Sequence, residues 1–565
     1  MLHLAIVITN KKMATDKEIE SYALLNALRH GGKANSGPIV GQILGRNPDL
    51  KKEMGKLVPK INEILKIVNA MSVQAQEKKL KEIAPELLEV KEVKKKGLKD
   101  LKNAIEGKVV TRAAPNPNGP IHIGSARAMV LSFLYAQKYK GKFILRFDDT
   151  SPKTKPPMPE AYKWIEDDLK WLGAKIDRIE YASKRFEIYY EIIEELINKG
   201  HAYICNCDPE KWRQLARKSK ACECRDLKPE EHMRRWKDMF SKYKEEEVVL
   251  RIKTDLNHKD PSRRDWWAAK VIDNPNHPIT KNKYKVWPSY NLQSAVDDHE
   301  MGVTHILRGQ EHVQNEYRQQ YVYDYLGWKY PETVHHGRVI LETGGLSTTK
   351  TREMIASGDY TGWDDPRLMT IRALRRRGFV PEAIRDVEIS IGLNTNDAIV
   401  TDDKIAAANR TYVEEKSNRY MFVENPILIK IIDAPEKVAE LEYHPDFPKR
   451  GRRKILTKGQ FFITKKDNEK LKKGHLYRLM DVLNFKDLKF VSEKVDDYRK
   501  EGRGILHWVT KDDSIDIEVL MLDGSTIKGK GESALKKVKK GEIIQFNRFG
   551  FCVKEESQKF VYSHK

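Results

Sequence analysis

One segment of the chain, RAAPNPNGPIHIGS at residues 112–125, combines glycines, prolines and a histidine between a β-prone run and a helix-like stretch. A phosphate chain at such a turn meets free backbone N–H groups and the positive end of the helix. Gly119 and Gly124 let the backbone approach a ligand closely, and His122 can donate to phosphate oxygens as negative charge develops on them. The pattern predicts a nucleotide phosphate site; an ordinary loop with an incidental histidine is the simpler alternative.

Four of the five cysteines form two Cys-x-Cys pairs, Cys205 with Cys207 and Cys222 with Cys224. Thiolates in two tight pairs suit tetrahedral Zn²⁺, and a set with no open ligand position indicates a structural role. The alternative is four free thiols in a reducing cytosol. Cys552 is expected to be a buried strand cysteine.

The elements around the first segment set its context. Residues 109–111 and 142–147 are β-prone, and residues 125–139 have helical spacing. Strand, glycine-rich turn, helix and strand in that order are typical of a parallel sheet that binds a nucleotide. Strand-like runs resume at residues 304–307 and 338–341, so we expect one Rossmann-like α/β domain that is split by an insertion.

The N-terminal and C-terminal regions differ from this domain in their hydrophobic periodicity. Residues 18–28 and 51–73 space apolar residues at three and four, which predicts helices, and a basic run follows at 90–99. From about residue 402, short alternating runs with turn signals predict one or two β-barrels. The clearest of these runs are residues 460–464, 504–509, 515–522 and 543–551.

The charge balance points to a polyanionic partner. The 565 residues carry 104 Lys+Arg against 82 Asp+Glu, a net charge of +22. Nucleic acid is the leading candidate, and a highly charged solvated surface is the alternative. The sequence contains no apolar run of about 18 residues, so no membrane span is expected. The first ten residues do not resemble a signal peptide. We therefore expect a cytoplasmic protein.

Residues 112–127 resemble the first signature of the glutamyl- and glutaminyl-tRNA synthetases, in particular the archaeal type of glutamyl enzyme. Ser125 departs from that signature, which ends in histidine. Further segments resemble the family in chain order, and the likeness spans residues 100–565. These segments are RFDDT at 146–150, YKVWPSYN at 284–291, VDDH at 296–299, GVTHILRGQEH at 302–312 and HHGRVIL at 335–341.

The resemblance implies a class I enzyme that activates L-glutamate with ATP and Mg²⁺ and transfers it to the 3′ end of tRNA-Glu. The resemblance implies an N-terminal helical appendage (1–100), followed by a Rossmann catalytic domain in two halves (101–200 and 286–345). An acceptor-binding module with the four-cysteine zinc knuckle (201–285) lies between the halves. An ATP-loop and helical stem-contact region (346–401) and an anticodon-binding region of β-barrels (402–565) complete the order.

A glutamate pocket needs cations for two carboxylates and an anion for the ammonium group. By resemblance, Arg112, Tyr290 and Arg308 are the donors, Asp148 is the acceptor, and Asn116 also contacts the substrate. For each residue alone, a structural salt bridge is the alternative. An arginine at position 308 suits a dianionic substrate better than a neutral amide, which favours glutamate over glutamine.

The second family signature, Lys-Met-Ser-Lys-Ser, is altered to GLSTTK at residues 345–350. Thr348 holds the position of the signature lysine, and Lys350 follows two residues later. The resemblance predicts that Ser347, Lys350 and Arg338 join His122, Gly119, Gly124 and Ser125 at ATP, with His122, Gly124 and Lys350 as catalytic residues. A solvated Lys350 in a structural loop is the alternative.

Arginines beyond this loop, Arg375, Arg376 and Arg377, are expected to contact tRNA phosphates, with a solvated helix end as the alternative. The aromatics Phe485, Trp508 and Phe549 lie among basic residues, and each is expected in the core. The archaeal resemblance favours use of tRNA-Gln as well as tRNA-Glu, with transient contact to a tRNA-dependent amidotransferase. The alternatives are a glutaminyl-tRNA synthetase, a truncated relative that modifies a tRNA base, and a non-catalytic tRNA-binding or amidotransferase-associated protein.

Overall fold

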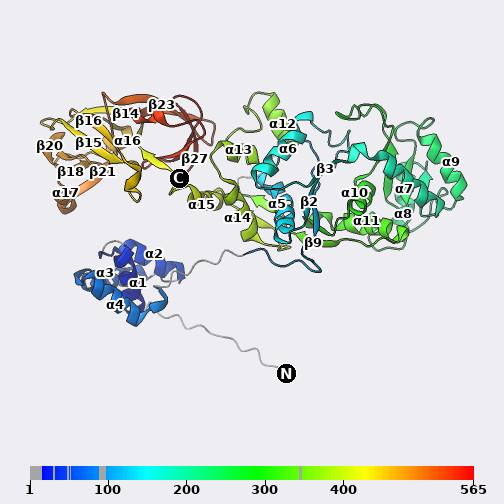
Figure 1. The fold of residues 1–565 in the computed structure, drawn as a ribbon, viewed down its shortest axis with the longest axis horizontal. Coiled ribbons are helices and arrows are strands. Elements are labelled where there is room, and N and C mark those ends of the chain that lie inside the picture. Colours follow the sequence, from blue (N-terminus) through cyan, green and yellow to red (C-terminus); the bar gives the residue numbers. More distant parts are fainter. Residues whose placement is uncertain (1–15, 30–31, 47–49, 51–52, 88–96, 343–346) are drawn as a thin grey trace, which may run out of the picture. The chain divides into compact units, whose positions relative to one another are not determined.

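A computed structural model describes residues 16–29, 32–46, 50, 53–87, 97–342 and 347–565. Most of the basic run at 90–99, and Gly345 and Leu346 of the second signature, lie outside these residues. The chain divides into two compact units, residues 1–97 and 98–565. Figure 1 shows the first unit in blue and the second from blue through cyan and green to red.

The N-terminal unit is helical, as the spacing predicted. Its helices are α1 (Asp16–Arg29), α2 (Ser36–Arg46), α3 (Met54–Ala70) and α4 (Val73–Ile83), followed by a short 3-10 turn, η2 (Pro85–Leu87). In α3 the buried side chains are Leu57, Ile61, Leu65 and Val68, so one apolar stripe faces the core of this unit.

The catalytic part is built on parallel strands, which confirms the predicted sheet. Strands β1 (Val110–Ala113), β2 (Lys142–Phe147) and β3 (Arg178–Tyr181) pair in parallel, and α5 (Ile123–Lys138) connects the first two. Strand β8 (His305–Gly309) pairs in parallel with β9 (Glu332–His336), and β10 (Val339–Leu341) with β11 (Ala398–Val400). The backbones of Thr304 and Val110 are joined by a hydrogen bond of 2.9 Å, which places the start of β8 beside β1.

Between β3 and β8 the chain forms an antiparallel sheet. Its strands, in the order β4-β5-β6-β7, are β4 (Ala202–Cys205), β5 (Val249–Ile252), β6 (Trp267–Val271) and β7 (Val286–Pro288). The helices of this stretch and its return are α6 (Pro159–Trp171), α7 (Phe186–Asn198), α8 (Pro209–Arg217), α9 (Pro229–Met239), α10 (Tyr290–Glu300) and α11 (Val313–Leu326). A core of aromatic and branched side chains joins α7 and α10 to this sheet.

The α-helices between residue 347 and the C-terminal sheets come next. They are α12 (Thr348–Ala356), α13 (Ile371–Arg376), α14 (Pro381–Ile391) and α15 (Asp402–Val413). Side chains of α13, α14 and α15 pack in the same core as α5 and β2, which ties these helices to the parallel sheet.

The C-terminal part consists of β-sheets drawn in yellow to red in Figure 1. A seven-stranded sheet has the order β12-β25-β26-β27-β23-β24-β13, and smaller sheets have the orders β14-β17-β22, β15-β16 and β20-β19-β18-β21. The strands are β12 (Asn418–Tyr420), β13 (Phe422–Glu424), β14 (Pro426–Lys430), β15 (Lys437–Glu442), β16 (Arg452–Thr457), β17 (Gln460–Thr464), β18 (Leu476–Leu479), β19 (Leu483–Lys486), β20 (Lys489–Ser492), β21 (Gly502–Leu506), β22 (Val509–Thr510), β23 (Ser514–Leu520), β24 (Thr526–Glu532), β25 (Ile543–Phe546), β26 (Gly550–Lys554) and β27 (Lys559–His564). All four predicted runs contain strands. In the part of the chain that the structure describes, no pairing joins the outer strands of a sheet to each other, so the predicted barrels are seen only as open sheets.

Across the described residues, no helix combines the length and the apolar composition needed to cross a bilayer.

Candidate active site

A cavity of about 720 Å³, here the first cavity, opens at the carboxyl ends of β1 and β8. Ligands bind at this end of parallel sheets because the strand-to-helix loops meet there. Nine of the predicted site residues line it: Arg112, Asn116, Gly119, His122, Gly124, Ser125, Tyr290, Arg308 and Arg338. Five arginine or lysine side chains and one acidic side chain, Glu311, are in the lining, so the cavity suits a polyanion.

The signature loop, residues 112–125, ends in a helix cap. His122 is the N-cap of α5, and its Nδ1 accepts a hydrogen bond of 3.2 Å from the Ser125 backbone N–H. The neutral ring therefore carries its proton on Nε2. The His122 side chain is exposed to the cavity, and partial desolvation by the surrounding protein lowers its pKa. At neutral pH His122 can thus donate from Nε2 to an anion in the cavity.

Ser125 has a second task in the same cap. Its hydroxyl donates to the His122 carbonyl at 2.9 Å, and the His122 N–H donates to the hydroxyl oxygen at 3.2 Å. The hydroxyl that replaces the family's last signature histidine is thus already used within the loop, although Ser125 lines the cavity.

The two signature glycines allow close packing. A Cβ added at Gly119 would lie 2.9 Å from the Thr348 methyl group, and one at Gly124 would lie 3.2 Å from the His122 ring and 3.4 Å from the Val339 carbonyl. Gly119 therefore lets α12 pack directly on the signature loop, and Gly124 lets β10 and the His122 ring approach each other.

A second cavity, of about 700 Å³, adjoins the first and shares His122, Gly124, Arg338 and Thr348 with it. Ser347 lines this second cavity, where it caps α12 by accepting a hydrogen bond of 3.2 Å from the Lys350 N–H. The guanidinium of Arg338, at the border of the two, donates to Asp397 at 2.9 Å.

Helix α12 presents a different cation from the predicted one. The Lys350 side chain is exposed and lines neither cavity. Arg352 lines the first cavity, and its Nη2 donates to the Asn118 carbonyl at 2.9 Å. The structure thus does not bring Lys350 together with His122.

Beneath the first cavity lies a network of buried charges. Arg112 donates to both carboxylate oxygens of Asp298, on α10, at 3.0 and 3.1 Å. Arg146, fully buried on β2, donates to Asp298 at 2.7 Å and to Asp148 at 2.7 Å. Gln293 also donates to Asp148, at 3.1 Å. Two arginines are thereby fixed between two parallel strands and a helix.

The network sets the pKa of its carboxylates in opposite directions. Burial acts to raise the pKa of Asp298, but Arg112 and Arg146 outweigh it and lower that pKa to about 2. For Asp148 burial dominates, and its pKa is raised despite the neighbouring arginines. Asp148 does not line the cavity, and Arg146 and Gln293 already occupy its carboxylate. It therefore supports the arginines from below in this structure and does not face a substrate.

Arg308 reaches the cavity from β8. Its two terminal nitrogens donate to Gln319 at 3.0 Å and to Tyr330 at 2.6 Å, while its Nε is buried with no acceptor among the described residues. Asn116 donates to the Asp148 carbonyl at 3.0 Å, and its Oδ1 is likewise buried without a partner. An open donor and an open acceptor thus remain in the lining.

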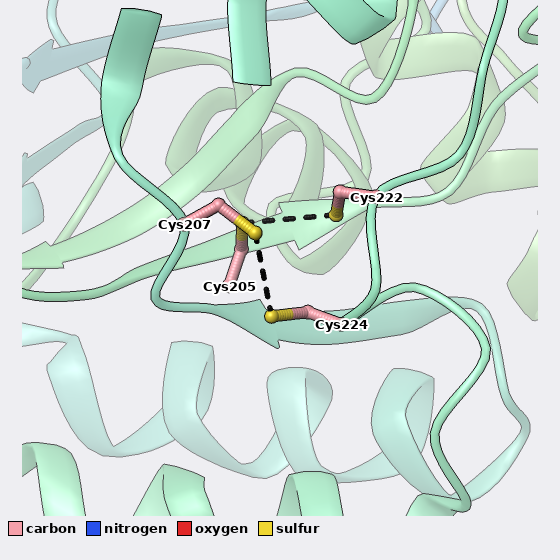
Figure 2. A group of neighbouring side chains, drawn as sticks. All are labelled: Cys205, Cys207, Cys222 and Cys224. Atoms are coloured by element: carbon pink, nitrogen blue, oxygen red, sulfur yellow. Dashed lines mark hydrogen bonds between the residues drawn. The ribbon is translucent and has the colours of Figure 1, made fainter. Parts of the chain in front are cut away.

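The four paired cysteines converge, as Figure 2 shows. Their sulfur atoms lie within 4.8 Å of one another, with Cys205 3.9 Å from Cys222 and Cys207 3.7 Å from Cys224. Tetrahedral Zn–S bonds of about 2.3 Å place sulfurs about 3.8 Å apart. The arrangement fits a structural metal site at the end of β4. Cys552 is buried in β26, as predicted.

The three predicted tRNA-binding arginines have different surroundings. Arg375 is exposed and lies 5.9 Å from the Trp171 ring. Arg376 donates to Glu555 at 2.5 Å, and Arg377 is buried and donates to the Ser563 carbonyl at 3.2 Å. The last two hold α13 against the C-terminal sheet. The aromatics Phe485 and Trp508 are buried in a core, and Phe549 packs partly buried against another.

Family profiles cover most of the chain. That of the tRNA synthetases class I (E and Q), catalytic domain, matches residues 108–415, and two anti-codon binding domains of the same class match residues 417–503 and 505–555. The chain therefore belongs to the class I tRNA synthetases of the E and Q group.

Full-length relatives narrow this class. A glutamate–tRNA ligase of Pyrococcus abyssi is 49% identical over 98% of this chain and 100% of its own. One of Methanothermobacter thermautotrophicus is 40% identical over 96% of this chain and 98% of its own. Within its class, the chain groups with the glutamate–tRNA ligases. A solved glutamate tRNA ligase from Elizabethkingia meningosepticum, in complex with its amino acid, is 23% identical, with a TM-score of 0.40 over 55% of this chain and 70% of that one.

Sequence reasoning assigned no role to several residues of the site. Arg146 and Asp298 lie in segments that resemble the family, and a charged residue amid apolar neighbours on a strand is a signal for a buried ion pair. Lys155 and Arg352 also line the first cavity, but nothing in their local sequence distinguishes them from surface cations.

Proposed function

We propose that the chain joins L-glutamate to tRNA in two steps within the first cavity. The α-carboxylate of glutamate attacks the α-phosphate of ATP, which yields glutamyl-adenylate and pyrophosphate. The 2′-hydroxyl of the terminal tRNA adenosine then attacks the carbonyl carbon and releases AMP. The observation that carries this proposal is the convergence of nine predicted residues on one cation-rich cavity in a chain of this class.

The ATP side is served by donors of the signature loop. The Nε2–H of His122, at the positive end of α5, is the donor that we place where charge develops on the α-phosphate, and a fixed donor there stabilises the transition state. The Ile123 and Ser125 N–H groups already donate to the Met369 carbonyl and to His122. Mg²⁺, which enters with ATP, neutralises the outer phosphates. Catalysis by this chain consists of positioning and charge stabilisation, and we name no general base.

The amino-acid side is served by two arginines. We assign Arg112 and Tyr290 to the side-chain carboxylate of glutamate and Arg308 to its α-carboxylate. Asn116, with its open Oδ1, accepts from the α-ammonium group, and Asp148 acts through Arg146 as a positioning residue. The cation-rich lining favours doubly negative glutamate over glutamine, because the neutral side-chain amide of glutamine offers Arg112 no charge to pair with.

The tRNA is contacted through the exposed Arg375, and the C-terminal sheets bind the anticodon. We extend the proposal to tRNA-Gln as a second acceptor, with transient handover to a tRNA-dependent amidotransferase. Aminoacylation of the two purified tRNAs separates these cases: charging of tRNA-Glu alone would remove tRNA-Gln and the amidotransferase from the proposal.

The cysteine cluster holds a structural Zn²⁺, since its four thiols fill a tetrahedron and leave no open position. Elemental analysis should find one zinc per chain, and Cys222→Ser should lose it together with thermal stability. A zinc-free protein of unchanged stability would contradict this role. Reduced thiols of this kind suit a cytoplasmic location.

Pyrophosphate exchange tests the function directly. With tRNA present, the purified protein should exchange labelled pyrophosphate into ATP with glutamate and far less with glutamine. A clear preference for glutamine would replace the proposal by glutaminyl-tRNA synthetase, and no exchange with either would favour a non-catalytic tRNA-binding protein.

A further inference from the structure

Two cations on α12 lie on different sides of the helix. Lys350 is exposed and lines neither cavity, whereas Arg352 lines the first. Helix residues turn by about 100° per position, so two positions separate these side chains by about 200°. They cannot both face the first cavity while α12 remains helical.

The Arg352 guanidinium is held at one atom and open at another. Nη2 donates to the Asn118 carbonyl in the signature loop at 2.9 Å, and Nε is buried without an acceptor. Buried donors in folded proteins normally have a partner. A phosphate oxygen in the cavity would complete this one.

Two contacts fix the start of α12 in the orientation that turns Arg352 toward the first cavity. The Thr348 methyl group packs against Gly119, and the Ser347 hydroxyl accepts from the Lys350 backbone N–H. Turning Lys350 toward the cavity would require both contacts to break. The position of the signature lysine, Thr348, has no charge to offer.

Other cations line the same cavity. Arg338 and Lys155 line it with Arg352, and the acidic side chain in the lining is Glu311. Several cations around one phosphate chain are typical of phosphoryl-transfer sites, where they offset the charge of the leaving group.

We propose that Arg352 binds the outer phosphates of ATP and replaces the signature lysine, while Lys350 stays outside the site. As the bond between the glutamate oxygen and the α-phosphorus forms, the bond from that phosphorus to pyrophosphate breaks, and its electron pair leaves with pyrophosphate. Arg352 offsets the charge of that leaving group. The inference rests on the proposed function, because it takes ATP as the substrate.

The test compares four variants of the full-length protein. Arg352→Ala should lower kcat for pyrophosphate exchange by about 10²–10³-fold, the usual loss for one transition-state donor, and raise KM for ATP, while KM for glutamate stays near wild type. Arg352→Lys should restore part of kcat. Lys350→Ala should lose far less than Arg352→Ala, and Glu353→Gln, an exposed neighbour on the helix, serves as the matched control for folding.

The inference is overturned if Lys350→Ala loses as much kcat as Arg352→Ala, or if Arg352→Ala keeps near-wild-type kcat. If Arg352→Ala does not fold, Arg352→Gln and Arg352→Lys carry the same comparison. Calorimetric measurement of Mg·ATP binding without amino acid tests the role of Arg352 separately from the proposed activation of glutamate. Weaker ATP binding by the Arg352 variants supports the inference even if wild type prefers glutamine, and unchanged binding and exchange refute it while the proposed function stands.

Discussion

The signature loop and α12 meet at the same cavity, yet they differ in how far local sequence decides their geometry. In the loop, all four residues predicted to bind ATP line the first cavity, because strand β1, the His122–Ser125 cap and α5 fix them within a short stretch of chain. On α12, Ser347 lies at the second cavity and Lys350 at neither. Loop residues are placed by caps and turns, whereas the face that a helix presents depends on distant packing partners.

The largest expected effect concerns the support beneath the loop. Arg112→Ala should abolish glutamate activation and lower the apparent thermal midpoint, because removing one partner of a buried ion pair costs about 3–5 kcal/mol. Asp298 would keep only Arg146. Arg178→Ala, which removes a partly exposed pair with Glu180, is the matched control and should cost at most about 1 kcal/mol.

Scanning calorimetry of both variants measures the difference. Equal midpoints for Arg112→Ala and Arg178→Ala would mean that the buried network does not support the site.

The next effect separates the two tasks of His122. His122→Ala removes a helix cap worth about 1 kcal/mol and a donor worth about 10²–10³-fold in kcat. His122→Asn keeps a good capping side chain but no longer places a donor where Nε2 lies. We expect His122→Asn to have nearly the thermal stability of the wild type but the low kcat of His122→Ala. Recovery of kcat in the Asn variant would show that the ring contributes only its cap.

The smallest effect tests the contact that joins the two segments. Gly119→Ala brings a Cβ to 2.9 Å from the Thr348 methyl carbon, so α12 must shift, and KM for ATP should rise by a few-fold. Thr348→Ser removes that methyl group. In the double variant most of the loss should disappear, as coupled neighbours are non-additive. Strictly additive losses would contradict direct packing between loop and helix.

The same distinction explains what the sequence could predict. The parallel sheet, the helix that joins its first two strands and the signature residues follow from periodicity and turn chemistry within short windows. Arg146 acquires a role only through Asp298, which lies 152 positions away, and β12 pairs with β25 across more than a hundred residues. Such long-range pairings leave no local pattern. For this reason the buried network and the choice of Arg352 were not predicted, and the C-terminal strands were predicted to close into barrels although the described residues form open sheets.

A crystal structure with a non-hydrolysable glutamyl-adenylate analogue most directly tests whether one cavity serves both substrates. The analogue's phosphate group should lie within hydrogen-bond distance of His122 Nε2, with its two carboxyl-derived ends at Arg112 and Arg308. Density for the analogue elsewhere, or its carboxylate bound away from both arginines, would contradict the proposed site.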